Sequence, residues 1–181
     1  MKKKVLIGMS GGVDSSVAAA LLKQQGYEVL GFHMRLWPSG DSAAAADAQM
    51  VCEKLGIPFF LFSFEELFQD RVISDFVDEY AKGRTPNPCV QCNKFLKFGA
   101  VFDKMHALGA DYVATGHYAK VVQQDGRFLL RQSKDCLKDQ TYMLYHLSQE
   151  QLSHILMPLG DLTKEEVRAI AKEKDLPVAS K

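Results

Sequence analysis

The sequence has neither an excess of charge nor a long apolar run. Its 22 Lys and Arg residues balance 22 Asp and Glu residues, so the formal net charge at pH 7 is zero. No global field therefore attracts nucleic acid, and any contact with RNA must come from a local group of basic residues. No apolar stretch approaches the roughly 20 residues of a membrane-spanning helix, so no membrane association is predicted. The apolar run after residues 1–4 is too short for a signal peptide, which predicts a cytoplasmic protein.

Cysteine is scarce, and its spacing is not that of a disulfide framework. In a chain without a secretion signal the four thiols are expected to be reduced, so metal or redox chemistry is favoured over disulfides. Cys89 and Cys92 form a Cys-x-x-Cys pair. Neither a second such pair nor a His-x-x-x-His motif is present to complete a zinc site. Three interpretations of the pair stay open: a redox pair, half of a metal site, or a nucleophile beside an unrelated cysteine.

Both of the commonest phosphate-binding motifs are absent. Without Gly-x-x-x-x-Gly-Lys-Ser/Thr a Walker-type NTPase is disfavoured, and without Gly-x-Gly-x-x-Gly a dinucleotide-binding fold is disfavoured. Instead, an apolar run leads into Ser-Gly-Gly-Val-Asp-Ser-Ser at residues 10–16, and a helix-like segment follows. Adjacent glycines let the backbone approach a ligand, and a helix N-terminus offers free N–H groups to phosphate. Asp14 would repel phosphate unless it caps the helix or holds a cation, which favours Mg²⁺ chelated by phosphate oxygens.

The order of the expected elements predicts a doubly wound α/β fold with a mostly parallel sheet. A strand at 3–8, a helix at 14–25 and a strand at 27–33 form a βαβ unit. A loop at 35–41 follows, and a Gly-containing turn at 124–126 predicts a small β-hairpin. We expect a catalytic domain at 1–145 and a helical extension at 146–181. The remaining predicted elements are helices at 42–55, 67–80, 94–108 and 164–174, strands at 59–62 and 111–115, and hairpin strands at 119–123 and 127–131.

Two further segments carry specific expectations. Phe68, Val72, Phe76 and Tyr80 have helical spacing, which predicts a stripe that faces the core. Residues 83–94 contain Pro86 and Pro88, which predict a stiff, exposed loop around the Cys-x-x-Cys pair. The nearby bases Arg84, Lys94 and Lys97 favour the thiolate, so a lowered cysteine pKa is expected.

Ligands of parallel sheets bind at the carboxyl ends of the strands. The Ser-Gly-Gly loop, Met34 and Gly116 all follow predicted strands, so we expect them to meet a nucleotide there. His117 lies at the same edge, where it could contact phosphate or RNA or serve a structural role.

Several of these segments together resemble the tRNA-specific 2-thiouridylase family and its N-terminal PP-loop ATP pyrophosphatase domain. The loop itself resembles that of the PP-loop superfamily, which has an adenine-nucleotide α-hydrolase-like fold and adenylates substrates with ATP. The resemblance extends over essentially all 181 residues. It rests on Gly-Met-Ser-Gly-Gly-Val-Asp-Ser at 8–15, Gly-Arg-Thr-Pro-Asn-Pro at 83–88, Cys-Asn-Lys at 92–94, Ala-Thr-Gly-His-Tyr at 114–118 and Lys-Asp-Gln-Thr-Tyr at 138–142.

The resemblance implies ATP-dependent 2-thiolation of the wobble uridine of tRNA. The base is adenylated and a cysteine-borne sulfur then displaces AMP, with ATP and Mg²⁺ required. The implied partners are a tRNA with a modifiable wobble uridine and a sulfur-donor protein, either a desulfurase or a relay protein. The implied nucleophile is Cys92, and the target base is met by Asn87, Pro88 and Cys89. The implied ATP site is Gly8, Met9, Ser10, Gly11, Gly12, Val13, Asp14, Ser15, Met34 and Gly116, and the implied tRNA contacts are His117, Lys138, Asp139 and Gln140.

Two departures from the family pattern leave alternatives open. Cys89 stands where the family often carries aspartate, and the sequence ends before the family's persulfide-carrying cysteine and its central and C-terminal domains. A catalytic-domain fragment or a minimal homologue is expected, and the isolated chain is not expected to turn over repeatedly. Cys89 could take the place of that missing cysteine, or Cys89, Cys92 and the missing cysteine could together hold a [4Fe–4S] cluster. Two other functions stay open: a PP-loop enzyme that adenylates a small molecule, and a nucleotide-binding module without turnover.

Overall fold

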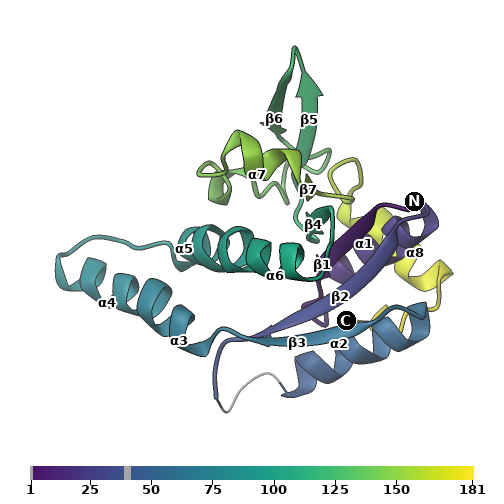
Figure 1. Cartoon of the computed structure of the whole chain (residues 1–181), viewed down its shortest axis with the longest axis horizontal. Helices are drawn as coiled ribbons and strands as arrows, with labels where there is room; N and C mark the ends of the chain where they lie inside the picture. The colour runs from purple at the N-terminus through teal and green to yellow at the C-terminus, as the bar shows by residue number, and fades with distance from the viewer. Residues whose placement is uncertain (1, 39–41) are drawn as a thin grey trace.

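The central sheet has five strands, all parallel, in the order β3–β2–β1–β4–β7 (Figure 1). The computed structural model describes residues 2–38 and 42–181, so residues 39–41 of the expected loop lie outside the described part. Chain order runs outward from β1 to β3 and then returns to β4 on the other side of β1. This reversal is the position where open parallel sheets bind ligands. The strands are β1 (Lys4–Gly8), β2 (Glu28–Arg35), β3 (Phe59–Ser63), β4 (Tyr112–Ala114) and β7 (Ile155–Leu156).

Two apolar cores, one on each face of the sheet, hold the helices in place. Val5 and Ile7 belong to one core and Leu6 to the other, because successive side chains of a strand point to opposite faces. The first core receives α1 (Val13–Gln24), α2 (Ser42–Leu55) and α8 (Lys164–Glu173). The second receives the helices between β3 and β4. The predicted doubly wound α/β fold is confirmed.

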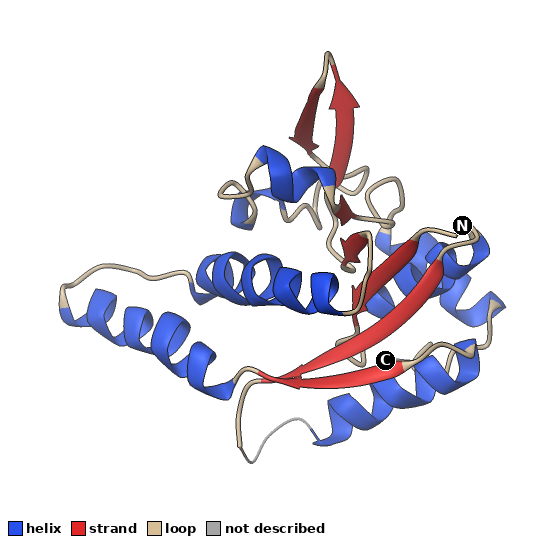
Figure 2. Ribbon diagram, in the orientation of Figure 1, coloured by secondary structure: helices blue, strands red, loops and turns tan. Residues whose placement is uncertain are grey.

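Two long helices connect β3 to β4 (Figure 2). Each contains a π-helical segment. The first helix consists of α3 (Glu65–Phe68), η1 (Gln69–Ile73) and α4 (Ser74–Ala81). The second consists of α5 (Pro88–Cys92), η2 (Asn93–Ala100) and α6 (Val101–Ala107). π-helical turns are frequent at functional sites.

The expected core stripe of the first helix is wrong at its C-terminal end. Val72 is buried, but Phe76 is 37% exposed and Tyr80 57% exposed. Their rings contact each other at a centroid distance of 4.9 Å. Figure 1 shows α4 beyond the carboxyl ends of β2 and β3 and directed away from the sheet, which leaves these two side chains outside the core of the sheet.

The C-terminal third of the chain adds an antiparallel hairpin and completes the sheet. Strands β5 (Lys120–Gln124) and β6 (Arg127–Arg131) pair around Asp125 and Gly126, both with positive φ, as the sequence predicts. The short helix η3 (Thr141–Met143) follows the hairpin. Residues 146–181 then form α7 (Gln149–Ser153), add β7 to the main sheet and pack α8 into its first core. This segment therefore shares the sheet and core of the preceding residues. Capping boxes start α7 and α8, at Ser148 with Gln151 and at Thr163 with Glu166.

Among the described residues, every helix is too short or too polar to cross a lipid bilayer.

Candidate nucleotide and thiol site

The loop between β1 and α1 has the geometry of an anion site. Gly11 has φ +76°, and a Cβ atom there would overlap the Ala44 backbone, so only glycine fits. The Ser10 N–H donates to Ser15 Oγ at 3.1 Å, which closes the loop around the start of α1. Gly12 is the N-cap and offers no side-chain oxygen to the first turn of the helix. The N–H groups of that turn are therefore available to a negatively charged ligand.

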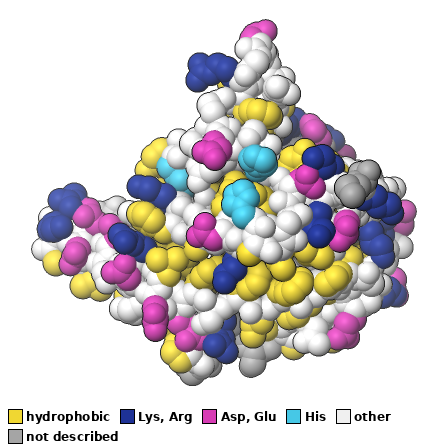
Figure 3. Space-filling model, in the orientation of Figure 1, with side chains coloured by type: hydrophobic (Ala, Val, Ile, Leu, Met, Phe, Trp, Pro, Cys, Tyr) yellow, Lys and Arg dark blue, Asp and Glu magenta, His cyan; other side chains and the backbone are white. Residues whose placement is uncertain are grey.

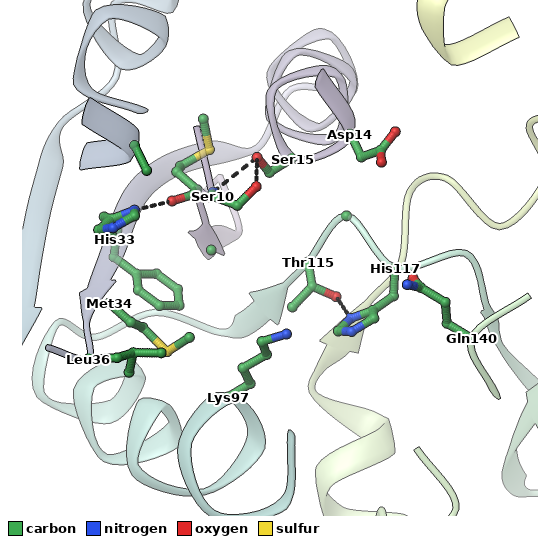
Figure 4. Close-up of a pocket in the computed structure, with 15 residues that line it drawn as sticks. Ser10, Asp14, Ser15, His33, Met34, Leu36, Lys97, Thr115, His117 and Gln140 are labelled. Carbon is green, nitrogen blue, oxygen red and sulfur yellow. Dashed lines mark hydrogen bonds between the residues drawn. The ribbon is translucent and has the colours of Figure 1, made fainter. Parts of the chain in front are cut away.

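A cavity of about 400 Å³ lies beside this loop, at the carboxyl ends of β1, β2 and β4 (Figure 4). Its position is where the strand order reverses, as expected for a ligand site of this fold. The cavity is lined by most of the predicted ATP site, but Gly11, Gly12 and Val13 are not among its lining residues. The lining residues are Gly8, Met9, Ser10, Asp14, Ser15, Phe32, His33, Met34, Leu36, Ala44, Lys97, Thr115, Gly116, His117 and Gln140.

Asp14 is held by two partners that are distant in the sequence. Lys164 Nζ lies 2.6 Å from Asp14 Oδ1 and 2.8 Å from Oδ2, and the Tyr118 hydroxyl donates to Oδ1 at 2.9 Å. Burial and Asp14 together raise the Tyr118 pKa, so this hydroxyl remains a donor. Because Lys164 neutralises Asp14, no free carboxylate among the lining residues balances the positive end of the α1 dipole. This positive end favours an anion in the cavity.

The donor set around Asp14 fits Mg²⁺ but not a closed metal centre. The described residues contain no group of three or more His, Cys, Asp or Glu side chains that could hold a metal ion. Mg²⁺ needs fewer protein ligands, because it is commonly bound by one or two carboxylates together with substrate phosphates. The partly exposed Asp14 carboxylate can supply that ligand when Lys164 Nζ, which lies within 2.8 Å of both of its oxygens, moves away toward the phosphates. A [4Fe–4S] cluster needs at least one thiolate besides those of Cys89 and Cys92. Cys52 is buried in α2 and cannot supply it.

The predicted loop around the two cysteines is in fact the start of a helix. Asn87 Oδ1 accepts from the N–H of Cys89 at 3.1 Å and from that of Val90 at 3.4 Å, so Asn87 is the N-cap. Pro88 occupies the first helical position, where its missing N–H has no partner to lose. The prediction of a loop is therefore wrong from residue 88 onward. Cys89 is exposed and Cys92 is half-buried, on one short helix.

The expected low pKa of Cys92 is also wrong. Burial raises the pKa of this thiol, and the charge of Lys97 lowers it by less. The other two expected bases act elsewhere, because Arg84 is paired with Glu79 and the Lys94 ammonium lies 4.9 Å from the centre of the Phe95 ring. The free protein therefore holds Cys92 as a protonated thiol at neutral pH.

This protonation state predicts an alkaline pH profile for alkylation. In a variant with Cys52→Ser, Cys89→Ser and Cys136→Ser, Cys92 is the remaining thiol. We expect the midpoint of its iodoacetamide rate against pH to be higher in the native protein than in the same variant unfolded in urea. The thiolate is the reactive form, and burial disfavours it only in the folded state. If the midpoint pH is lower in the native protein than in the unfolded one, the fold lowers the Cys92 pKa, and the activated thiol expected from the sequence is correct.

The predicted tRNA residues separate into two groups. His117 and Gln140 line the cavity, whereas Lys138 is exposed outside it. His117 Nδ1 lies 2.7 Å from Thr115 Oγ1, and burial together with Lys97 lowers the His117 pKa to about 3. The imidazole is therefore neutral and gives no charge to a phosphate. Asp139 accepts from the N–H groups of Ser133 and Thr141 and so shapes its own loop.

Sequence reasoning missed several residues of the cavity and its rim. The sequence presents Lys97 only as a base near the cysteines. Its spacing of five from Cys92 is a signal for the site, because residues five apart lie on one side of a π-helical turn. Lys164 is 150 residues from Asp14, and no local pattern links the two. The other missed lining residues are Phe32, His33, Leu36, Ala44 and Thr115.

The surface of the face seen in Figure 3 carries no field of one sign. Basic and acidic side chains alternate over it, and histidines lie near its centre. This mixed distribution agrees with the zero net charge of the chain.

The fold and the cavity define an α/β nucleotide-binding domain of the PP-loop type. The chain belongs to the family of the tRNA methyl transferase HUP domain, whose model matches residues 3–181. Curated relatives named tRNA-specific 2-thiouridylase MnmA include one from Clostridium perfringens, 56% identical over 99% of this chain and 53% of the relative. Another, from Acetivibrio thermocellus, is 54% identical over 99% of this chain and 54% of the relative. The predicted resemblance is thus confirmed, and the chain spans about half the length of the curated relatives it matches.

Solved structures share the fold at low sequence identity. NMN synthetase from Francisella tularensis superposes with a TM-score of 0.62 at 18% identity, over 99% of this chain and 66% of that one. A predicted subunit of tRNA methyltransferase from Methanocaldococcus jannaschii gives a TM-score of 0.60 at 16% identity, over 94% and 75%. These likenesses concern the architecture alone.

Proposed function

We propose that this chain is the ATP-binding catalytic domain of an enzyme that 2-thiolates the wobble uridine of tRNA. The observation that carries the proposal is the PP-loop cavity beside the helix that bears Cys92. One side chain, Lys97, lines the cavity and also acts on the Cys92 pKa, so the two features are close in space. The names of the curated relatives support the same substrate and product.

The chemistry requires an activated base and a sulfur nucleophile. The O2 oxygen of uracil attacks the α-phosphorus of ATP, the bond from that phosphorus to the bridging oxygen breaks, and pyrophosphate leaves. Sulfur then adds to C2, and AMP departs with the former O2. In the persulfide route a donor protein loads sulfur onto Cys92, the outer sulfur adds to C2, and a second thiol then cleaves the S–S bond, which frees 2-thiouridine and leaves a disulfide for a cellular thiol to reduce. In the sulfide route hydrogen sulfide from the donor adds to C2, and no S–S bond has to break. Cys92 supplies the nucleophilic side chain, with Asn87, Pro88 and Cys89 beside the target base.

ATP would lie in the cavity with its triphosphate on residues 8–15 and its adenine near Met34. Gly116 lines the cavity and lets the first turn of α1 approach β4 closely, and Mg²⁺ would be shared between Asp14 and the phosphates. The tRNA would meet His117 and residues 138–140. We propose the cytoplasm as the compartment of this reaction.

Two other reactions give different products and can be separated by one measurement. The family description names a methyl transferase, and the structural neighbours include synthetases that act on small molecules. The Cys-x-x-Cys helix favours sulfur transfer, because neither methyl transfer nor amide synthesis needs a thiol. Mass spectrometry of tRNA nucleosides from cells with and without the gene tests this. Loss of 2-thiouridine is expected, whereas loss of a methylated nucleoside, or no change, would contradict the proposal.

The phosphate site makes a separate prediction for Asp14→Asn. The amide keeps the size of the side chain and can still accept from Tyr118, but it loses the charge that holds Mg²⁺. We expect calorimetry to show affinity for Mg²⁺·ATP reduced about tenfold, in line with a charged contact of roughly 1.5–3 kcal/mol. Without Mg²⁺, ATP affinity should be equal or higher, because Lys164 is released toward the phosphates.

The matched control is Asp175→Asn, which removes an exposed carboxylate paired with Lys54. It should leave both affinities unchanged. Equal losses with and without Mg²⁺ for Asp14→Asn would mean that Asp14 acts on the fold rather than on the cation.

A further inference from the structure

Lys97 brings a positive charge into the cavity from the side opposite the phosphate loop. It lies on η2 and lines the cavity, and Figure 4 shows its amine reaching inward between Met34 and Thr115. Within the described part of the chain it forms no hydrogen bond or ion pair. Neighbouring bases have partners, since Lys94 lies over the Phe95 ring and Lys104 over the Phe62 ring.

A lysine ammonium in a partly enclosed cavity calls for an anion. Removing the ammonium from water is costly unless an opposite charge compensates it. Asp14 is the carboxylate among the lining residues, and its two oxygens are already paired with Lys164. The positive end of α1 adds to the same field. The cavity is therefore built for a ligand with more than one negative charge, bound between α1 and η2.

The position of Lys97 decides which part of that ligand it meets. Residues five apart in a π-helical turn lie close together, so Lys97 and Cys92 share one side of the helix. The charge of Lys97 lowers the pKa of Cys92 on one side and that of His117 on the other. Sulfur must reach the base that has just reacted with ATP, so the reacting phosphate must face the helix that bears Cys92.

We propose that Lys97 is a catalytic residue that contacts the α-phosphate of ATP and stabilises its charge during adenylation. This inference rests on the proposed function. As O2 of the base attacks and pyrophosphate leaves, negative charge spreads over the α-phosphoryl oxygens. A fixed ammonium at that point stabilises the transition state without a proton transfer.

Calorimetric titration of the 181-residue protein with ATP, AMP and adenosine tests the assignment. For Lys97→Met we expect ATP and AMP affinities to fall by about tenfold or more, as for a charged contact. Adenosine has no phosphate, so its affinity should stay unchanged. Lys97→Arg should recover part of the loss. Lys104→Met is the matched control on the next helix, outside the cavity, and should bind all three as the wild type does.

The outcomes separate this inference from the proposed function. If the wild type binds neither ATP nor AMP, the proposed function fails. If the wild type binds both and Lys97→Met binds them equally well, the contact with phosphate is refuted. A loss for ATP alone would place Lys97 on the β- or γ-phosphate and overturn the α-phosphate assignment. An equal loss for adenosine would show a structural role, which circular dichroism of the variant would reveal as altered folding.

Discussion

Cys92→Ser is expected to eliminate tRNA thiolation while leaving ATP binding intact. The serine hydroxyl cannot carry a sulfane sulfur, so the second chemical step loses its nucleophile. Loss of a covalent nucleophile lowers turnover on the order of a thousandfold or more. Cys92 is not among the residues that line the ATP cavity, which is why the nucleotide should still bind. The measurement is 2-thiouridine content of tRNA in a deletion strain complemented with the variant gene, beside calorimetry with ATP.

Three further serine substitutions serve as comparisons. Cys52 is buried in α2 and Cys136 is exposed in the loop after β6, so both variants should thiolate normally. Cys89→Ser distinguishes the mechanisms. If Cys89 only lies beside the base, much activity should remain, and if it resolves a persulfide or ligates a cluster, activity should disappear. Normal thiolation by Cys92→Ser would remove Cys92 from the mechanism.

Gly116→Ala should destabilise the protein and impair nucleotide binding together. A Cβ atom at this position would lie 2.8 Å from the Ser15 nitrogen, 3.0 Å from the Asp14 carbonyl carbon and 3.1 Å from the Ser15 Cα. These are backbone atoms of the first turn of α1, so no side-chain rotation relieves the overlap. Overpacking of this kind costs about 1–3 kcal/mol of the free energy of unfolding. It also pushes the phosphate loop away from β4, so ATP affinity should fall at least about tenfold.

Urea denaturation and ATP titration of the same variant measure both effects. Gly8→Ala is the matched control for stability, because its Cβ would meet the Phe32 ring at an ordinary 3.4 Å. The free energy of unfolding should change less in Gly8→Ala than in Gly116→Ala. If Gly116→Ala is as stable as the wild type, the phosphate loop and β4 can move apart without loss of unfolding free energy. The close contact between Gly116 and α1 would then not be needed for the site.

The sequence predicted the fold because its signals are local. The apolar strand, the glycine pair and the helix over residues 3–25 identify the βαβ unit and the phosphate loop without any distant contact. The capping boxes that start α7 and α8 are equally local, because each is formed by two residues three positions apart. The two-residue strand β7 was missed, because a strand of that length has no periodicity and forms only by pairing with β4.

Predictions about exposure and charge failed where distant packing decides them. The apolar stripe of α4 was expected in the core, but the helix lies beyond the carboxyl ends of β2 and β3 and leaves Phe76 and Tyr80 exposed. Nearby bases were expected to lower the Cys92 pKa, but burial outweighs Lys97 and raises it. Pro88 was expected to exclude helix, yet the Asn87 cap makes it the first helical residue.

The sequence by itself therefore determined the α/β class, the phosphate loop, the family resemblance and the identity of the thiol pair. These follow from residue types at fixed short spacings. Only the tertiary structure paired Asp14 with Lys164, brought Lys97 into the cavity and set the protonation states of Cys92 and His117. Those properties depend on burial and on Coulomb interactions between segments up to 150 residues apart, and such distances are fixed only when the helices pack on the sheet.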